Sequence, residues 1–245
     1  MKNNVKPLDI IFYLLYNVII NKKGGLKMKL TQTQNLAVDL LLLAFDRDNH
    51  TIKIYTPKRE VEPSIGLRAL PGVLVKQGEH LSSAVKRTLD EKTPVETLTY
   101  HLQELPARTN PERDERGHVV SIPILVLLPN YKNLDTDWLK FTPNMDLAFD
   151  HTEMVNLAYR VLTNNWDKHP LPLLLAGEKT TLEEAKDLLV HFQPYYEKVL
   201  PSNLRQMTFV DKFLQETDES EKSDQKGRPK KLYRIKTEQI HPLYT

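Results

Sequence analysis

Residues 70–95 read LPGVLVKQGEHLSSAVKRTLDEKTPV, a short apolar stretch followed by a glycine turn and a charged segment. From His80 to Lys92 apolar residues recur every three or four positions, which predicts a helix with one apolar face. Positions 88, 91 and 92 share one face of such a helix, because residues three and four apart are neighbours. They hold Thr88, Glu91 and Lys92, so this face carries one carboxylate beside one cation.

The segments around this helix predict a mixed α/β fold. The runs 36–45 and 52–55 are apolar and flank a polar turn, which indicates a β-hairpin; only Asp39 interrupts the first run. Residues 119–128 are typical of a buried strand, and 152–164 have helical spacing. We further expect strands at 98–105 and from Trp138, and loops at 58–69 and 108–117.

Composition excludes several kinds of site. The chain has 245 residues and no cysteine, which removes disulfides, thiol catalysis and cysteine-based zinc or iron–sulfur centres. Its eight histidines do not form the HExxH pattern of a zinc site. The net charge of +2 is too small to indicate nucleic-acid binding, so that case depends on a local basic patch.

The first residues have an unusual composition. The apolar run 9–20 is shorter than the roughly 20 residues of a membrane span and lacks a small-residue cleavage site. Residues 22–25 read KKGG, which corresponds to a purine-rich coding stretch at ribosome-binding distance from Met28. We therefore expect translation to start at Met28 and 1–27 to be upstream sequence read in frame. A disordered arm and a membrane anchor are the alternatives.

The last third of the chain changes character at 168–172, which is rich in proline. Helices are predicted at 180–192, capped by Thr180 or Thr181, and at 201–214. A polar run at 216–227 precedes an alternating strand at 232–236. Residues 222–236 contain seven basic residues and one acidic residue. Helix, helix, basic loop and strand is the order of a winged helix-turn-helix.

Residues 70–95 resemble the signature of the Nudix hydrolase family, G-x5-E-x7-R-E-U-x-E-E-x-G-U, where U is apolar. The matching positions are Glu79, Arg87, Leu89, Glu91 and Val95. The departures are Val73 and Pro94 in place of glycines, and Thr88 and Lys92 in place of carboxylates.

These departures bear on metal binding. The family's carboxylates hold Mg²⁺, which prefers oxygen ligands and activates water for attack on a pyrophosphate. Lys92 opposes a metal ion by charge repulsion, and Glu91 is the one residual candidate ligand. We therefore expect no required cofactor and no catalytic residue, and a site that binds a nucleotide-like ligand without hydrolysing it.

Residues 109–121, TNPERDERGHVVS, resemble a loop of Nudix proteins that act on ADP-ribose and related NAD metabolites, and 147–151 match a further element of that subgroup. Arginine suits diphosphates because its guanidinium binds oxygens bidentately. The predicted ligand-binding residues are Arg59, Arg68, Glu79, Arg113, Asp114, Arg116 and His151. The alternative is that Arg113 and Arg116 pair with neighbouring acids, and that His151 is a structural hydrogen-bonding residue.

Residues 227–234, GRPKKLYR, resemble the wing of the Nudix-related transcriptional regulators of the NrtR group, whose box carries L-x-E-K-T as 89–93 do here. Cations on a hairpin neutralise phosphates and position a helix in the major groove. The predicted DNA-binding residues are Ser202, Asn203, Arg205, Gln206, Lys212, Arg228, Lys230 and Lys231. A solvated basic tail is the alternative.

The sequence as a whole predicts a Nudix-type α/β/α sandwich at 28–166 and a winged helix-turn-helix at 167–245. The resemblance implies a cytoplasmic, homodimeric, ligand-responsive repressor that binds a double-stranded DNA operator and ADP-ribose or a related NAD metabolite. It implies no membrane association. The alternatives are a sugar-responsive regulator, a Mg²⁺-dependent ADP-ribose or nucleotide-sugar pyrophosphatase with an accessory domain, and a protein-interaction module.

Overall fold

The computed structural model describes residues 18–21, 25–28, 34–96, 99–164, 166–205, 207–221 and 229–240. The chain divides into two compact units, 1–35 and 36–245. In the first unit the antiparallel strands β1 (Val18–Asn21) and β2 (Gly25–Met28) form a hairpin. The rest of 1–27, to which the start-site hypothesis applies, lies outside the described residues.

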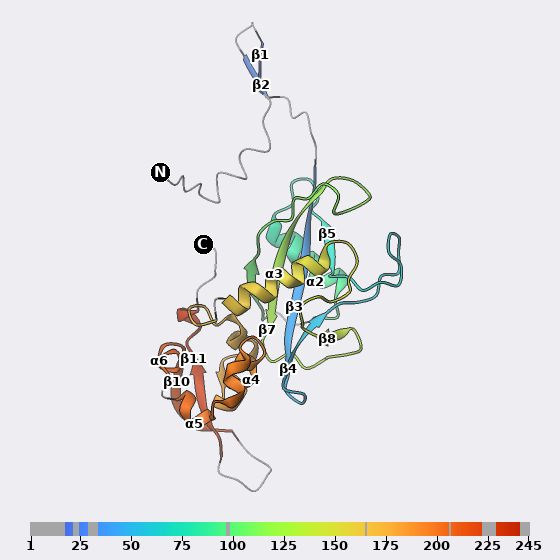
Figure 1. Cartoon of the computed structure of the whole chain (residues 1–245). Coiled ribbons are helices and arrows are strands. Elements are labelled where there is room, and N and C mark those ends of the chain that lie inside the picture. The colour runs from blue at the N-terminus through green and yellow to red at the C-terminus, as the bar shows by residue number, and fades with distance from the viewer. Residues whose placement is uncertain are drawn as a thin grey trace. The chain divides into compact units, whose positions relative to one another are not determined.

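A six-stranded sheet forms the centre of the second unit (Figure 1). Its order is β6-β7-β3-β4-β8, and β5 also pairs with β3. The strands are β3 (Asn35–Asp46), β4 (Thr51–Tyr55), β5 (Gly72–Leu74), β6 (His101–Glu104), β7 (Val119–Leu128) and β8 (Trp138–Lys140). The predicted hairpin and the predicted strand at 119–128 are therefore confirmed.

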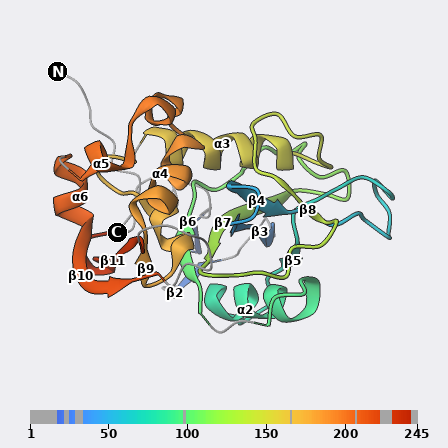
Figure 2. The ribbon, with the colours of Figure 1, turned by 90° about the horizontal axis from the view of Figure 1, so that it is seen from below.

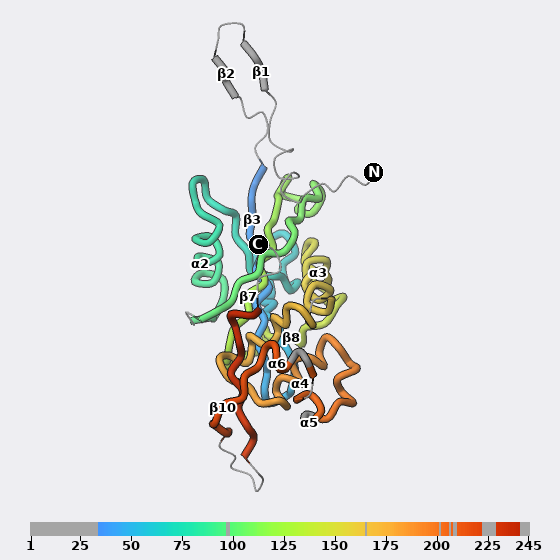
Figure 3. The backbone as a smooth tube through the Cα atoms, turned by 90° about the vertical axis from the view of Figure 1, so that its left-hand side faces the viewer, coloured from blue at the N-terminus to red at the C-terminus, as the bar shows by residue number. Residues whose placement is uncertain are grey.

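One helix covers each face of this sheet, α2 (Leu81–Lys92) on one side and α3 (His151–Asn164) on the other (Figures 2 and 3). Alternate residues of β3 serve the two layers. Leu40 packs in the cluster that includes α2, and Leu41 packs in the cluster that includes α3. Because β3 is buried on both faces, its sequence is a continuous apolar run. The predicted three-layer α/β/α arrangement is confirmed.

Residues 167–240 form a smaller group of helices around a three-stranded sheet of order β10-β11-β9. The elements are a 3₁₀ turn (Leu171–Ala176), β9 (Lys179–Thr180), α4 (Leu182–Val190), a 3₁₀ turn (Pro194–Lys198), α5 (Pro201–Leu204), α6 (Thr208–Phe213), β10 (Leu214–Ser220), β11 (Lys231–Ile235) and a 3₁₀ turn (Thr237–Gln239). Thr181 caps α4 by accepting a hydrogen bond from the Glu184 backbone N–H at 3.1 Å, as the sequence predicted.

Two expectations for this region are wrong. The predicted single helix at 201–214 is two short helices, separated at Met207 by extended backbone. In a continuous helix Leu204 and Phe213, nine residues apart, would lie on opposite faces, and the break allows both to be fully buried. The basic loop expected after this helix begins as strand β10, because residues 216–220 of the polar run belong to that strand, and their mostly exposed side chains give no alternating pattern. Among the described residues, no helix is long and apolar enough to cross a membrane.

Candidate functional site

A cavity of about 710 Å³ opens beside β3 and β5. Its wall is formed by these strands, the loop from Pro57, the end of α2 and the segments around Arg113 and Phe149. The predicted residues that line it are Arg59, Glu91, Arg113, Asp114, Arg116 and His151. The structure therefore brings most of the predicted ligand-binding residues, which are distant along the chain, to one cavity.

Asp39 is a buried carboxylate in the cavity wall, 7% exposed. It lies opposite Gly72 in the β3–β5 pairing, and a Cβ on Gly72 would come within 2.1 Å of its Oδ1 atom. Only glycine therefore leaves room for the carboxylate here. Oδ2 accepts hydrogen bonds from Ser121 Oγ at 2.6 Å and from Arg113 Nη2 at 3.2 Å.

The guanidinium group of Arg113 donates hydrogen bonds to carboxylates of the protein. Its side chain is 3% exposed and donates to Asp150 at 2.8 and 3.2 Å as well as to Asp39. Arg113 therefore pairs with acidic residues, as the alternative supposed. These acids lie on β3 and just before α3, however, and are not the sequence neighbours of Arg113. Direct contact between Arg113 and a ligand stays a prediction.

His151 is held as a neutral hydrogen-bonding residue. The Leu70 backbone N–H donates to its Nδ1 atom at 2.9 Å, so Nδ1 carries the lone pair. Nε2 then carries the proton and faces Asp39 Oδ1 at 3.7 Å. Burial lowers the pKa of His151, and the nearby Asp39 carboxylate opposes this shift. This geometry fits the structural alternative for His151.

Phe149 carries two guanidinium groups that line the cavity. The Cζ atoms of Arg59 and Arg116 lie 4.8 and 5.4 Å from the centre of its ring. Asp114 orients Arg116 by accepting hydrogen bonds from Nε at 2.9 Å and Nη2 at 2.6 Å, and this contact lowers the pKa of Asp114. Phe149 has φ +58°, a strained conformation for an aromatic residue. Phe149 lies in the motif at 147–151, but no local pattern in the sequence marks it as a site residue.

Arg68 and Glu79 do not line the cavity. Arg68 donates to Thr56 O at 2.6 Å and to Asp137 Oδ1 at 3.1 Å. Glu79 accepts two hydrogen bonds from Arg87, at 2.9 and 2.8 Å, which lower its pKa to about 2. Arg68 therefore holds two loops together, and Glu79 holds the segment before α2 against that helix.

The face of α2 that carries Thr88, Glu91 and Lys92 does not fit Mg²⁺. Thr88 is buried and its hydroxyl donates to the Ala84 carbonyl at 2.7 Å. Glu91 is 54% exposed and lies 3.9 Å from Arg87, and Lys92 lies beside it on the cavity wall. In the described part of the chain, no three His, Asp or Glu side chains are grouped to hold a metal ion. A role for Glu91 as residual ligand stays a prediction.

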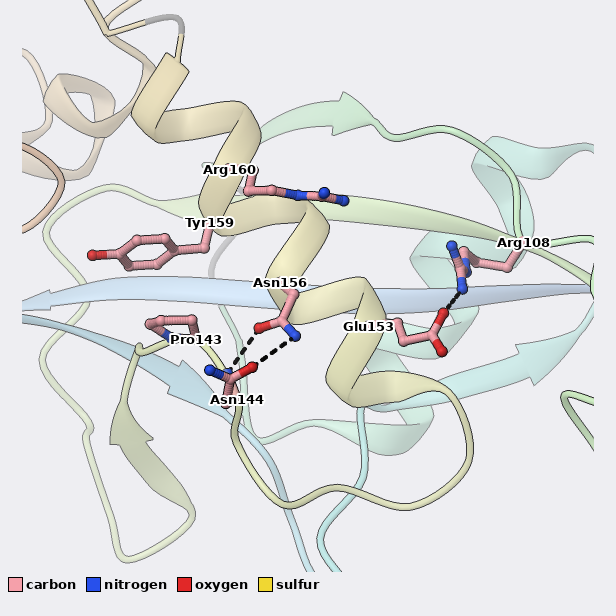
Figure 4. Close-up of a pocket in the computed structure, with 7 residues that line it drawn as sticks. All are labelled: Arg108, Pro143, Asn144, Glu153, Asn156, Tyr159 and Arg160. Carbon is pink, nitrogen blue, oxygen red and sulfur yellow. Dashed lines mark hydrogen bonds and ion pairs between the residues drawn. The ribbon is translucent and has the colours of Figure 1, made fainter.

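A second cavity of about 390 Å³ lies along α3 (Figure 4). Four of its polar residues pair with one another: Asn144 N–H donates to Asn156 Oδ1 at 2.8 Å, and Arg108 pairs with Glu153. None of the residues predicted to bind ligand or DNA lines it. The cavity beside β3 is therefore the stronger candidate site.

The predicted DNA-binding residues lie on short, exposed segments. Ser202 and Asn203 are on α5 and Lys212 is on α6. Arg205 follows α5, Lys231 is the first residue of β11, and Lys230 immediately precedes that strand. Arg205 and Lys231 both pair with Glu216 of β10, which brings these segments together. Gln206 and Arg228 lie outside the described residues.

Comparison with known proteins gives one relative over most of the chain and one over about half of it. No family model matches. The chain is 28% identical over 217 residues to the "ADPR responsive transcriptional repressor NtrR" of Acinetobacter baylyi, covering 82% of this chain and 81% of the relative. It is 32% identical over 143 residues to the ADP-ribose pyrophosphatase of Methanocaldococcus jannaschii, covering 56% of this chain and 80% of the relative.

The crystal structure of Shewanella oneidensis NrtR complexed with a 27mer DNA has the same fold, with a TM-score of 0.67 and 24% identity over 84% of this chain and 95% of that one. The α/β/α sandwich, the cavity and the pyrophosphatase relative together place the chain in the Nudix family. Within that family, the chain resembles the regulators represented by the Acinetobacter repressor and the Shewanella NrtR structure.

Proposed function

We propose that the chain is a ligand-responsive transcriptional repressor that senses ADP-ribose or a related nucleotide and binds operator DNA. One observation carries this proposal: the cavity is present, while the helix face that holds metal in Nudix hydrolases carries Thr88 and Lys92. Such a site keeps ligand binding without the ions needed for hydrolysis. The match to the Acinetobacter repressor supports it, because that match extends well beyond the Nudix part.

We infer that 28–166 is the ligand-binding domain and 167–245 a winged helix-turn-helix. Helices α4 to α6 followed by the β10–β11 hairpin support this assignment. In that fold a helix enters the major groove and the wing contacts the backbone. We further propose a homodimer on a palindromic operator, since protein two-fold symmetry is mirrored in such sites. Light scattering of the purified protein tests the dimer.

We propose that Arg59 and Arg116 hold the diphosphate of the ligand, while Asp39, Arg113 and Asp150 keep the cavity wall in place. Both proposed diphosphate ligands line the cavity and are oriented by Phe149. Arg116→Ala is expected to weaken ADP-ribose binding about tenfold or more, because charge-assisted hydrogen bonds are lost. Isothermal titration calorimetry measures this, and Arg160→Ala, in the second cavity, serves as the matched control.

The pyrophosphatase relative favours a second candidate, Mg²⁺-dependent hydrolysis of ADP-ribose. The two functions separate in one assay, in which protein is incubated with ADP-ribose and Mg²⁺ or Mn²⁺ and AMP is measured. The regulator is expected to bind the ligand and release no AMP above background. Metal-dependent turnover that disappears in Glu91→Gln would establish the hydrolase instead.

A further inference from the structure

The strand beside the predicted DNA-binding strand is acidic. Strand β10 and the residue after it contain Glu216, Asp218, Glu219 and Glu221, and β10 pairs antiparallel with β11. A carboxylate repels DNA phosphate, so an acidic strand is unexpected in a hairpin proposed to contact a duplex.

Three of the predicted DNA-binding cations form ion pairs with carboxylates of the protein. Glu216 pairs with Arg205 and, at 3.5 Å, with Lys231 Nζ. Glu183, on α4, pairs with Lys230 and raises its pKa. These side chains are between 38% and 59% exposed, and exposed ion pairs contribute little to stability. Their consequence therefore lies in what the cations can bind.

We propose that Glu216 sets the DNA affinity of this surface, because its carboxylate holds Arg205 and Lys231 until a DNA phosphate displaces it. Glu183 acts in the same way on Lys230. The inference rests on the proposed function. The inference goes beyond that function, because it assigns a role to the chain's own acidic residues: they weaken binding to duplexes of any sequence. Base contacts then supply a larger share of the remaining affinity.

The restraint has a measurable signature in the salt dependence of binding. A cation that neutralises a phosphate releases a counterion, and affinity then falls with salt with a slope of about −0.9 per phosphate. When the cation leaves a carboxylate, that carboxylate takes up a cation from solution and offsets part of the release. Removing the carboxylate is therefore expected to make the slope steeper.

The test is fluorescence anisotropy of a labelled random-sequence duplex, titrated with full-length protein at NaCl concentrations from about 50 to about 200 mM. Glu216→Gln is expected to bind about 3- to 30-fold more tightly at low salt, with a slope steeper by up to about 1, because one carboxylate takes up at most one cation. Glu183→Gln also removes one carboxylate and is expected to change the slope by a similar amount. The matched control is Asp218→Asn, with the same charge change two residues along β10 and no ion pair among the described residues.

Equal slopes for Glu216→Gln and Asp218→Asn would overturn the inference, because the effect would then be one of general charge. Weaker DNA binding by a folded Glu216→Gln protein would also overturn it, by showing that Glu216 orients Arg205 toward DNA. Circular dichroism and urea unfolding establish that each variant is folded. If wild-type protein binds no duplex at all, the proposed function itself fails, which is a different result.

Discussion

At the scale of single residues, the cavity depends on a buried charge network. Asp39 and Asp150 approach Arg113 from β3 and the start of α3, and all three side chains are at most 10% exposed. Removing one carboxylate breaks a buried, hydrogen-bonded ion pair, which costs several kcal/mol. The local sequence signal for Asp39 in this network is that it interrupts an apolar run.

Asp39→Asn is expected to lower the free energy of unfolding by about 3 kcal/mol, because Arg113 loses a buried counter-charge. Urea unfolding measures the change. Glu153→Gln removes the exposed carboxylate partner of Arg108 and should cost less than about 1 kcal/mol. Similar costs for the two variants would contradict a buried network at Asp39.

Sequence reasoning identified the cavity residues better than their partners. Arg113, Arg116 and His151 belong to short motifs, so their positions could be found from a resemblance. The acids that hold Arg113 lie 74 and 37 residues away along the chain. Such pairs are formed by tertiary packing and leave no local pattern, which is why adjacent acids were considered instead.

At the scale of elements, α4 is joined to the Nudix part at both of its ends. Near its start, Arg47 pairs with Glu184 at 2.6 Å and donates to Asn130 Oδ1 at 2.7 Å. Just after its end, His191 Nε2 lies 2.7 Å from Phe141 O, and Tyr159 donates to the His191 carbonyl at 3.0 Å. These contacts fix α4 against the β3–β4 turn, β8 and α3.

Acid is expected to weaken the junction at His191. Burial, opposed by the hydrogen bond to Phe141, lowers the pKa of His191 to about 4 from 6.5. Between these values the unfolded chain binds a proton that the folded chain does not. The free energy of unfolding therefore falls as the pH falls through this window, by about 3 kcal/mol in total.

Urea unfolding at a series of pH values measures this loss. His191→Gln is expected to flatten the pH dependence below about 6.5, whereas His118→Gln, at an exposed site, should leave it unchanged. An identical pH profile for wild type and His191→Gln would contradict the assignment.

Glu184 provides a separate test of the junction at the start of α4. Glu184→Ala removes a largely buried carboxylate that also accepts from Thr180, and should cost about 2 kcal/mol of unfolding free energy. Glu183→Ala, at the neighbouring exposed position, should cost less than about 1 kcal/mol. Urea unfolding measures both losses. A larger loss of unfolding free energy for Glu183→Ala than for Glu184→Ala would contradict the junction.

Elements with a local signature were predictable. The hairpin from 36 to 55 and strand β7 were found from apolar runs, and α2 from its spacing. The break at Met207 was not, because it exists to bury Leu204 and Phe213 in a core built by distant segments. Strand β10 was missed because its hydrogen bonds to β11, rather than buried side chains, hold it in place.

At the scale of the whole molecule, ligand-responsive repression requires that the proposed ligand cavity and the proposed DNA-binding surface influence each other. Strand β3 links them physically, since Asp39 lies in the cavity wall and Arg47, just beyond the end of the strand, contacts α4. A ligand shifts such an equilibrium only by its differential affinity for two arrangements. The same coupling must then appear from the DNA side, because linkage is reciprocal.

The most direct test of this central claim is an anisotropy titration of duplexes from upstream of the protein's own gene and of neighbouring genes. Each is measured with and without saturating ADP-ribose, against scrambled duplexes at matched salt. We expect sequence-selective binding whose dissociation constant changes about 5- to 150-fold with ADP-ribose. Selective binding that ADP-ribose leaves unchanged, or binding that does not distinguish these duplexes from scrambled ones, would contradict the account.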